Sequence, residues 1–275
     1  MTIGGATRVA CVIGDPVEHS RSPLMHNAAA EALGLDRVYV ALRVAPADLE
    51  AALRGLAALG FDGANVTLPH KAAATALCDE LGDEARDAGA VNTLSFSAGG
   101  RLRGDLTDGL GLVAALAQVP ERAVVLGSGG STRAAAAALL RAGTRRLTIV
   151  ARRPEAASEL AAELAVLEPE AQVAAEASVS GERGGLLVNC TPVGGITDLK
   201  GLPVSADVID RMDTVADFAY RADGSPTPLA AAARAAGLPV VDGLELLVRQ
   251  GALSFRRWTG IEPPLDVMRR AARGE

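Results

Sequence analysis

The N-terminal part of the chain alternates short apolar runs with segments whose apolar residues recur at helical spacing. Arg8 to Ile13 is an apolar run that predicts a strand, and Pro23 to Leu33 has the spacing of a helix. Val38 to Val44 alternates like a half-buried strand. A helix is expected between Pro46 and Gly60, because proline favours the first turn of a helix and glycine its end. Strands that alternate with helices indicate an α/β fold.

The same alternation continues until the pattern changes near Leu106, where we place a domain boundary. The elements expected before this point are strands at Gly63 to Leu68, Ala90 to Phe96 and Leu102 to Gly104, and a helix at Lys71 to Leu81.

A second series of strands and helices follows Pro120. Ala123 to Leu126 and Arg146 to Val150 are apolar runs, and Ser131 to Ala142 between them is an alanine-rich helix. Such a strand–helix–strand unit predicts parallel pairing. The later elements expected are strands at Leu186 to Val188, Val208 and Ile209, Thr214 to Ala216, and Val240 and Val241, with helices at Leu229 to Ala236, Leu244 to Trp258 and Leu265 to Ala272.

Size and charge narrow the classes of function. A chain of 275 residues with 49% hydrophobic residues can bury two domain cores, which excludes disorder. The net charge of −6 gives no positive field for a polyphosphate, so nucleic acid is not an expected partner. We expect no membrane association, because no run approaches the ~20 apolar residues of a membrane span and the first residues lack the pattern of a secretory leader.

The cysteines indicate neither disulfides nor a metal centre. Cys11, Cys78 and Cys190 lie far apart with no CxxC pair, which is typical of reduced, mostly buried thiols. The three histidines have no metal-ligand spacing. We therefore expect a cytoplasmic protein without a bound metal.

A glycine-rich turn joins the first strand of the second series to its helix. It contains five candidate residues for cofactor binding: Gly127, Ser128, Gly129, Gly130 and Ser131. Backbone N–H groups and the helix dipole at such a turn can hold a diphosphate. The spacing departs from GxGxxG because Thr132 stands at the third glycine, so a tight turn without a ligand is the alternative interpretation.

Two arginines follow the next strand, where NAD-binding proteins carry an acid for the ribose hydroxyls. The chain reads Val150, Ala151, Arg152, Arg153 at this point. Guanidinium groups pair with a 2′-phosphate, so the arginines favour NADP over NAD. A solvated helix start is the alternative.

Polar residues also follow the expected strands of the N-terminal half. Ser20 and Ser22 precede the helix that begins at Pro23, where they suit either a small carboxylate or ordinary helix capping. Lys71 follows a strand end and points either into a cleft or into solvent. Asp108 lies at the domain junction, where it also suits the cap of the next helix.

These segments resemble the motifs of the shikimate dehydrogenase family, in the family's order and over nearly the whole chain. The matching segments are HSxSPxxHN at His19 to Asn27, NVTxPxK at Asn65 to Lys71, AxNT at Ala90 to Thr93, the TD pair at Thr107 and Asp108, NxTxxG at Asn189 to Gly194, Tyr220 with Thr227 to Leu229, and the final helix from Gly243 to Gln250.

The resemblance implies an NADP-dependent enzyme that interconverts 3-dehydroshikimate and shikimate in aromatic amino acid biosynthesis. It implies Lys71 and Asp108 as the catalytic pair, since a cationic lysine stabilises the alkoxide charge that develops on a reduced ketone. The implied substrate-binding residues are Ser20, Ser22, Thr67, Asn92, Tyr220 and Gln250. The implied cofactor-binding residues are those of the glycine turn with Arg152, Arg153, Thr191 and Gly243.

The resemblance also implies the roles of the two expected domains. Residues 1–105, completed by 239–275, would form an N-terminal α/β substrate domain. Residues 106–238 would form a Rossmann-like, doubly wound NADP-binding domain, with the site in the cleft between the two. The expected partner is the small-molecule substrate, and the expected state is a monomer or homodimer.

Three positions depart from the family pattern. Leu106 replaces an asparagine, Leu246 replaces a methionine, and Ala151 replaces an asparagine beside the arginines. Because of Leu106, a quinate or aminoshikimate dehydrogenase of the same family is an alternative. A catalytically silent ligand-binding homologue is a second alternative, and the presence of both Lys71 and Asp108 argues against it.

Overall fold

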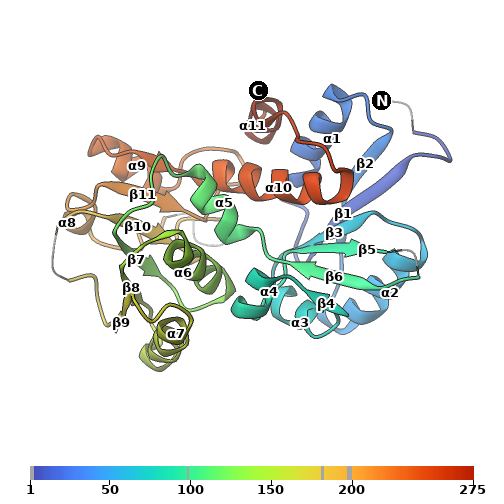
Figure 1. The fold of residues 1–275 in the computed structure, drawn as a ribbon. Coiled ribbons are helices and arrows are strands. Elements are labelled where there is room, and N and C mark those ends of the chain that lie inside the picture. The colour runs from blue at the N-terminus through green and yellow to red at the C-terminus, as the bar shows by residue number, and fades with distance from the viewer. Residues whose placement is uncertain (1–2, 98, 181–182, 197–199) are drawn as a thin grey trace. The chain divides into compact units, whose positions relative to one another are not determined.

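The computed structural model describes residues 3–97, 99–180, 183–196 and 200–275, and it divides into two compact units. The first unit comprises Met1–Thr107 and Leu247–Glu275, and the second comprises Asp108–Leu246. Strands alternate with helices in both units (Figure 1), which confirms the α/β class.

The first unit is built on a six-stranded mixed sheet with the strand order β2-β1-β3-β5-β6-β4. Its strands are β1 (Arg8–Gly14), β2 (Arg37–Arg43), β3 (Gly63–Val66), β4 (Glu80–Leu81), β5 (Thr93–Phe96) and β6 (Leu102–Asp105). Its helices are α1 (Ser22–Ala32), η1 (Pro46–Asp48), α2 (Leu49–Ala58), α3 (Lys71–Thr75), α4 (Asp83–Ala88) and α11 (Leu265–Arg273), with the later part of α10 (Gly243–Thr259). β1 pairs in parallel with β2 and β3, whereas β5 runs antiparallel to β3 and β6.

Helices α1, α10 and α11 share one apolar core in the first unit, and α1 lies beside α11 in Figure 1. Met25 of α1, Phe255 of α10 and Met268 of α11 are buried in it. A second cluster places Tyr39 of β2 against Trp258 of α10, and the Trp258 indole N–H donates to the Leu94 carbonyl at 2.9 Å. Aromatic packing therefore attaches the C-terminal helices to the N-terminal sheet.

The second unit is built on a six-stranded sheet in which every pairing is parallel, as expected. Its strands are β7 (Arg122–Leu126), β8 (Arg146–Val150), β9 (Gln172–Glu176), β10 (Leu186–Asn189), β11 (Thr214–Asp217) and β12 (Val240–Val241). Its helices are α5 (Asp108–Ala115), α6 (Gly130–Ala142), α7 (Pro154–Leu167), α8 (Ala206–Ile209) and α9 (Pro228–Ala235), with the start of α10. The order β9-β8-β7-β10-β11-β12 is the 3-2-1-4-5-6 order of a doubly wound Rossmann sheet.

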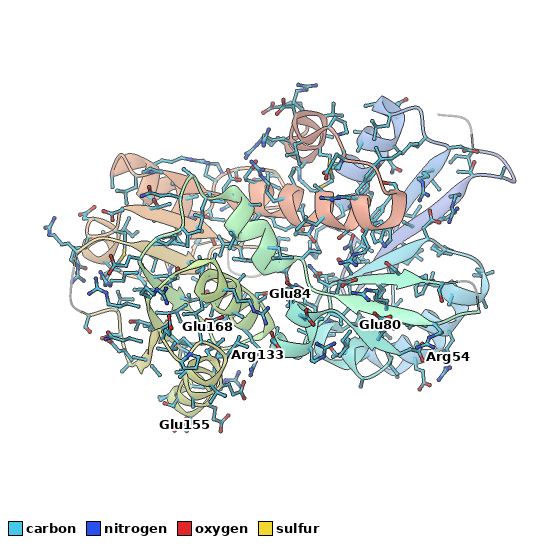
Figure 2. The ribbon with its side chains drawn as sticks, viewed as in Figure 1. Arg54, Glu80, Glu84, Arg133, Glu155 and Glu168 are labelled. Atoms are coloured by element: carbon cyan, nitrogen blue, oxygen red, sulfur yellow. The ribbon has the colours of Figure 1, made fainter. Side chains whose placement is uncertain are left out.

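Apolar layers cover both faces of this parallel sheet. Ala123 and Val125 of β7 face one core with α6 and α7, and the alternate residues Val124 and Leu126 face the other with α8 and α9. The charged side chains of Arg133 on α6 and Glu155 on α7 lie outside these layers (Figure 2). A sheet that is buried on both faces explains the nearly continuous apolar runs of its strands.

Three expectations about secondary structure differ from the observed elements. The helix expected from Lys71 to Leu81 ends at Thr75, because Glu80 and Leu81 pair with β6 instead. Val208 and Ile209 are helical, not a strand, and both side chains enter the core beneath α9. Two adjacent apolar residues are too few to show whether the apolar positions recur at the period of a helix or of a strand. Strand β9 completes the sheet by pairing with β8, and helix α7 connects these two strands. No element was expected in this stretch.

The boundaries of the compact units also differ from the expected domain limits. The first boundary follows Thr107, two residues later than expected. The second follows Leu246, not residue 238, because β12 pairs in parallel with β11 and so belongs to the second sheet.

None of the described helices is long and apolar enough to cross a membrane. Within the described ranges, no three His, Cys, Asp or Glu side chains gather as they would around a metal ion.

Candidate active site

In the first unit, the loops that follow β1 and β3 lie side by side. Ile13 pairs with Val66 at the strand ends, and the N–H of Thr67 donates to the Ile13 carbonyl at 3.0 Å. A Cβ on Gly14 would lie 2.5 Å from the Thr67 methyl group, so only glycine permits this approach. The two polar segments that were separate in sequence therefore meet at one edge of the sheet.

Ser20 and Ser22 lie in the first of these loops. Ser22 is the first residue of α1 and is buried, and its N–H donates to the Ser20 hydroxyl at 3.3 Å. The Ser22 side chain is hydrogen-bonded to the Tyr39 hydroxyl. The cap position of α1 is Arg21, with no side-chain cap among the described residues, so the capping interpretation of Ser22 is wrong.

Lys71 begins α3 in the second loop, and its backbone is tightly held. His70, immediately before it, is buried and bonded through Nε2 to the Val44 carbonyl at 2.7 Å. The Lys71 carbonyl accepts from the N–H of Val91 at 3.0 Å, which joins it to the segment that carries Asn92. The Lys71 side chain is half-buried.

Asn92 connects three parts of the first unit. Its amide nitrogen donates to the Thr107 hydroxyl at 3.0 Å and to Oε1 of Gln250 at 3.3 Å, and its oxygen accepts from the N–H of Thr107 at 2.8 Å. Thr107 directly precedes Asp108, the buried first residue of α5. Asn92 therefore holds both Gln250 and the peptide that leads into Asp108. Leu106, one residue earlier, is buried.

A buried polar network that sequence reasoning did not assign supports these residues. Asn65 donates to the Ser254 hydroxyl at 2.9 Å and to the Thr93 hydroxyl at 3.2 Å, and it accepts from the Tyr39 hydroxyl at 2.7 Å. Burial raises the pKa of Tyr39, so the phenol remains a proton donor at neutral pH. His26 stacks on the Tyr39 ring, and burial lowers its pKa to about 3, so the imidazole is neutral.

In the second unit, the glycine turn lies at the carboxyl end of β7. Gly127 has φ of +115°, and a Cβ there would lie 2.8 Å from the Thr132 hydroxyl. Gly129 is the cap residue of α6, and a Cβ there would meet nothing within 4 Å. Among the described residues, no side chain caps this helix and no acid lies in its first turn. The Thr132 hydroxyl is buried without a hydrogen-bond partner in the described structure.

These observations fit a bound diphosphate at the turn. The first N–H groups of the 13-residue helix α6 have no side-chain acceptor from the described chain, and the helix dipole favours an anion there. Ser128 and Ser131 lie half-buried beside the glycines, and Gly130 begins the helix in an exposed position.

The arginines expected to select NADP follow the neighbouring strand at the same edge. Val150 ends β8 opposite Leu126, and its carbonyl accepts from the N–H of Gly127 at 2.8 Å. Arg152 and Arg153 are exposed, and within the described residues neither pairs with a carboxylate. Two cations therefore stand at the edge that carries the glycine turn.

Thr191 and Gly243 lie in loops of the second unit that sequence analysis also selected. Thr191 follows β10 and lies next to the turn, with its methyl carbon 3.5 Å from the Cβ position of Gly127. Gly243 begins α10 where a Cβ would collide with the Ala219 carbonyl, so the close approach requires glycine. Tyr220, the next residue after Ala219, is half-buried.

Two family profiles match this chain. The shikimate dehydrogenase substrate binding domain matches residues 12–94, and the shikimate 5′-dehydrogenase C-terminal domain matches residues 243–273.

Full-length relatives agree with these profiles. A protein of Rubrobacter xylanophilus named shikimate dehydrogenase (NADP(+)) is 43% identical, over 99% of this chain and 98% of its own. The crystal structure of shikimate 5-dehydrogenase from Thermus thermophilus in complex with NADP(H) and shikimate has a TM-score of 0.85 and 38% identity, covering 97% of this chain and 99% of that one. The ligand-free 5-ketofructose reductase of Gluconobacter sp. strain CHM43 has a TM-score of 0.87 and 30% identity, covering 98% and 99%. On the identity and coverage of these relatives, this chain belongs to the shikimate dehydrogenase family.

Proposed function

We propose that this protein catalyses the reversible, NADPH-dependent reduction of 3-dehydroshikimate to shikimate. The observation that carries the proposal is the Asn92 network, which holds Gln250 and the peptide before Asp108 in one hydrogen-bonded set beside the backbone of Lys71. A cyclic substrate with several hydroxyls requires this many donors and acceptors.

Lys71 and Asp108 are the proposed catalytic pair. NADPH, when bound, supplies the hydride that reduces the ketone. The carbonyl oxygen gains negative charge in that step, and the Lys71 ammonium stabilises it and donates the proton that completes the hydroxyl. Asp108 accepts a hydrogen bond from the substrate hydroxyl and so orients it. In the reverse direction, Lys71 takes up the proton that the hydroxyl releases.

The remaining substrate contacts divide by chemistry. Ser20 and Ser22 lie at the N-terminus of α1 and are proposed to bind the carboxylate, with help from Tyr220. Thr67, Asn92 and Gln250 are proposed to bind the ring hydroxyls. Asn65 and Tyr39 are not proposed to bind the substrate; they hydrogen-bond to each other, Asn65 also bonds to Ser254, and both support the site from within the protein.

The cofactor contacts follow the carboxyl edge of the second sheet. The turn from Gly127 to Ser131 is proposed to bind the diphosphate through backbone N–H groups. Arg152 and Arg153 are proposed to pair with the 2′-phosphate, which NAD lacks, and this pairing supports NADP as the cofactor. Thr191 and Gly243 are proposed to border the nicotinamide.

The experiment is a set of initial rates for oxidation of shikimate and of quinate, each with NADP and with NAD, followed by the absorbance of the reduced cofactor. Fast turnover with shikimate and NADP alone is expected. Preference for quinate would instead make this a quinate dehydrogenase and would assign the change to positions such as Leu106. Reduction of 5-ketofructose by NADPH is a further assay, because the similar Gluconobacter protein is named a 5-ketofructose reductase. No turnover in any combination would refute the proposed reaction.

The free thiols support a reducing compartment. Cys11, Cys78 and Cys190 form no disulfide, and burial raises the pKa of Cys11 to about 12, so its thiol is unreactive. We propose that the enzyme works in the cytoplasm as a monomer or homodimer. Sedimentation of the purified protein distinguishes a monomer from a homodimer.

A further inference from the structure

Asp217 is a fully buried carboxyl group that sequence reasoning did not select. It is the last residue of β11, and within the described residues no arginine or lysine forms an ion pair with it. A buried carboxylate without a cation is costly unless hydrogen bonds replace the lost water. Burial raises the pKa of Asp217 to about 6.

One carboxyl oxygen, Oδ1, is the nearer of two acceptors that orient the Asn189 amide; the other is the Val193 carbonyl, at 3.3 Å from Nδ2. Oδ1 accepts from Nδ2 of Asn189 at 2.8 Å. The Asn189 amide oxygen therefore points the other way, where it accepts from the N–H of Thr191 at 3.0 Å and from the Thr191 hydroxyl at 2.6 Å. If the acceptor at Asp217 were lost, the amide could turn over and present N–H groups to Thr191.

The same oxygen also fixes the loop after β11. Oδ1 accepts from the N–H of Ala219 at 3.0 Å. The Ala219 carbonyl is the atom that packs against Gly243, and Tyr220 follows it directly. One oxygen thus holds two loops, which carry Thr191 and the contact with Gly243.

The second oxygen anchors a helix. Oδ2 accepts from the Thr227 hydroxyl at 2.5 Å, and the same hydroxyl accepts from the N–H of Ala230 to cap α9. The Thr227 hydroxyl is thereby used as both donor and acceptor. The Asp217 side chain therefore bonds to three segments: the end of β10, the loop after β11 and the start of α9.

We propose that Asp217 is a positioning residue for the nicotinamide cofactor, acting through Asn189 on Thr191 and through Ala219 on the loop at Gly243. Asp217 itself does not touch the cofactor. The proposal rests on the proposed function, in which Thr191 and Gly243 border the nicotinamide.

The test compares two substitutions with opposite expectations. Asp217→Leu has a similar shape but no acceptor, so it frees the Asn189 amide. Asp217→Asn keeps one acceptor oxygen for Asn189 and Ala219 when its own NH2 group faces Thr227. We expect Asp217→Leu to weaken binding of NADP, measured by isothermal titration calorimetry, about tenfold, the equivalent of one net hydrogen bond. We expect Asp217→Asn to bind NADP within about twofold of the wild type, a change too small to represent a lost hydrogen bond.

Asp213→Leu is the matched control. Asp213 lies just before the other end of the same strand, is exposed, and accepts from the N–H of Gly185 at 2.7 Å. It should bind NADP like the wild type. Equal losses for Asp217→Leu and Asp213→Leu would reduce the effect to general destabilisation and overturn the proposal.

Further measurements separate positioning from loss of structure. Shikimate binding to Asp217→Leu should change less than NADP binding, and the reverse order would contradict the proposal. Thr191→Val should weaken NADP binding in the wild type and add no further loss to Asp217→Leu, whereas additive losses would exclude the route through Thr191. If Asp217→Leu does not fold, Asp217→Ser, which also places no fixed acceptor at Asn189, carries the same expectation.

The binding readout keeps this proposal distinct from the proposed reaction. Wild-type protein that binds NADP but does not turn over shikimate would refute the reaction and leave the role of Asp217 to be decided by the variants. Wild-type protein that binds neither NADP nor NAD would overturn both.

Discussion

Replacing Asp217 with asparagine should change how stability depends on pH, with a sign opposite to that of most carboxyl groups. The ordinary pKa of the carboxyl is 3.8, and burial raises it to about 6 in the folded protein. Between these values the folded state binds more protons than the unfolded state, so stability falls as pH rises. The carboxyl is neutral in both states only well below pH 3.8, and its ionisation has its full destabilising effect only well above pH 6.

The magnitude follows from the two pKa values. A difference of about two pKa units corresponds to about 3 kcal/mol, at 1.36 kcal/mol for each unit. Asparagine has the shape of the protonated acid and does not titrate. The free energy of unfolding of the wild type, minus that of Asp217→Asn, should therefore decrease by about 2.4 kcal/mol between pH 4 and pH 7, which is most of the full effect.

Urea unfolding followed by far-ultraviolet circular dichroism, at half-unit steps of pH, measures this difference. Other titrating groups are common to both proteins and cancel in the subtraction. Asp213→Asn makes the same chemical change at an exposed position and controls for effects unrelated to burial. A difference that stays constant, or that increases with pH, would refute the assignment of a raised pKa to Asp217.

Three further substitutions test the candidate site. Lys71→Ala should lower kcat at least about a hundredfold while shikimate affinity, measured by equilibrium binding, changes less, and unchanged turnover would remove Lys71 from the mechanism. Arg152→Ala should raise KM for NADPH about tenfold and leave KM for NADH unchanged; an equal effect on both would exclude contact with the 2′-phosphate. Gly127→Ala should lower both Tm and NADP affinity, because a side chain at φ of +115° is strained and would press on Thr132. Gly143→Ala is its control, with φ of +116° and no atom within 4 Å of the Cβ position, and should lower Tm without affecting NADP binding.

Local sequence patterns predicted the order of most strands and helices. The parallel sheet of the second unit and the glycine turn after β7 both follow from apolar runs and glycines a few residues apart. The errors came where local pattern was weakest. The pair Val208 and Ile209 is too short to show a period, and Glu80 and Leu81 form a strand only because β6 offers an edge.

The supporting network of the candidate site was not predictable in the same way. Asn65 donates to Ser254, 189 positions away, and Tyr39 donates to Asn65 from a different strand. Such contacts depend on how the chain folds back, and no local pattern encodes them. A signal was present for Asp217, since an acid at the end of the apolar run Thr214 to Ala216 must be satisfied inside the protein.

The aromatic cluster of the first unit gives this protein a selective optical probe. The chain has a single tryptophan, Trp258, and it is packed near Tyr39 and His26 in the first unit, whereas the second unit contains none. The fluorescence of Trp258 therefore reports unfolding of the first unit, whereas far-ultraviolet circular dichroism reports loss of the helices in both units. The two unfolding curves will coincide when the units unfold together and will separate when one unfolds first, so a single urea titration measures their cooperativity.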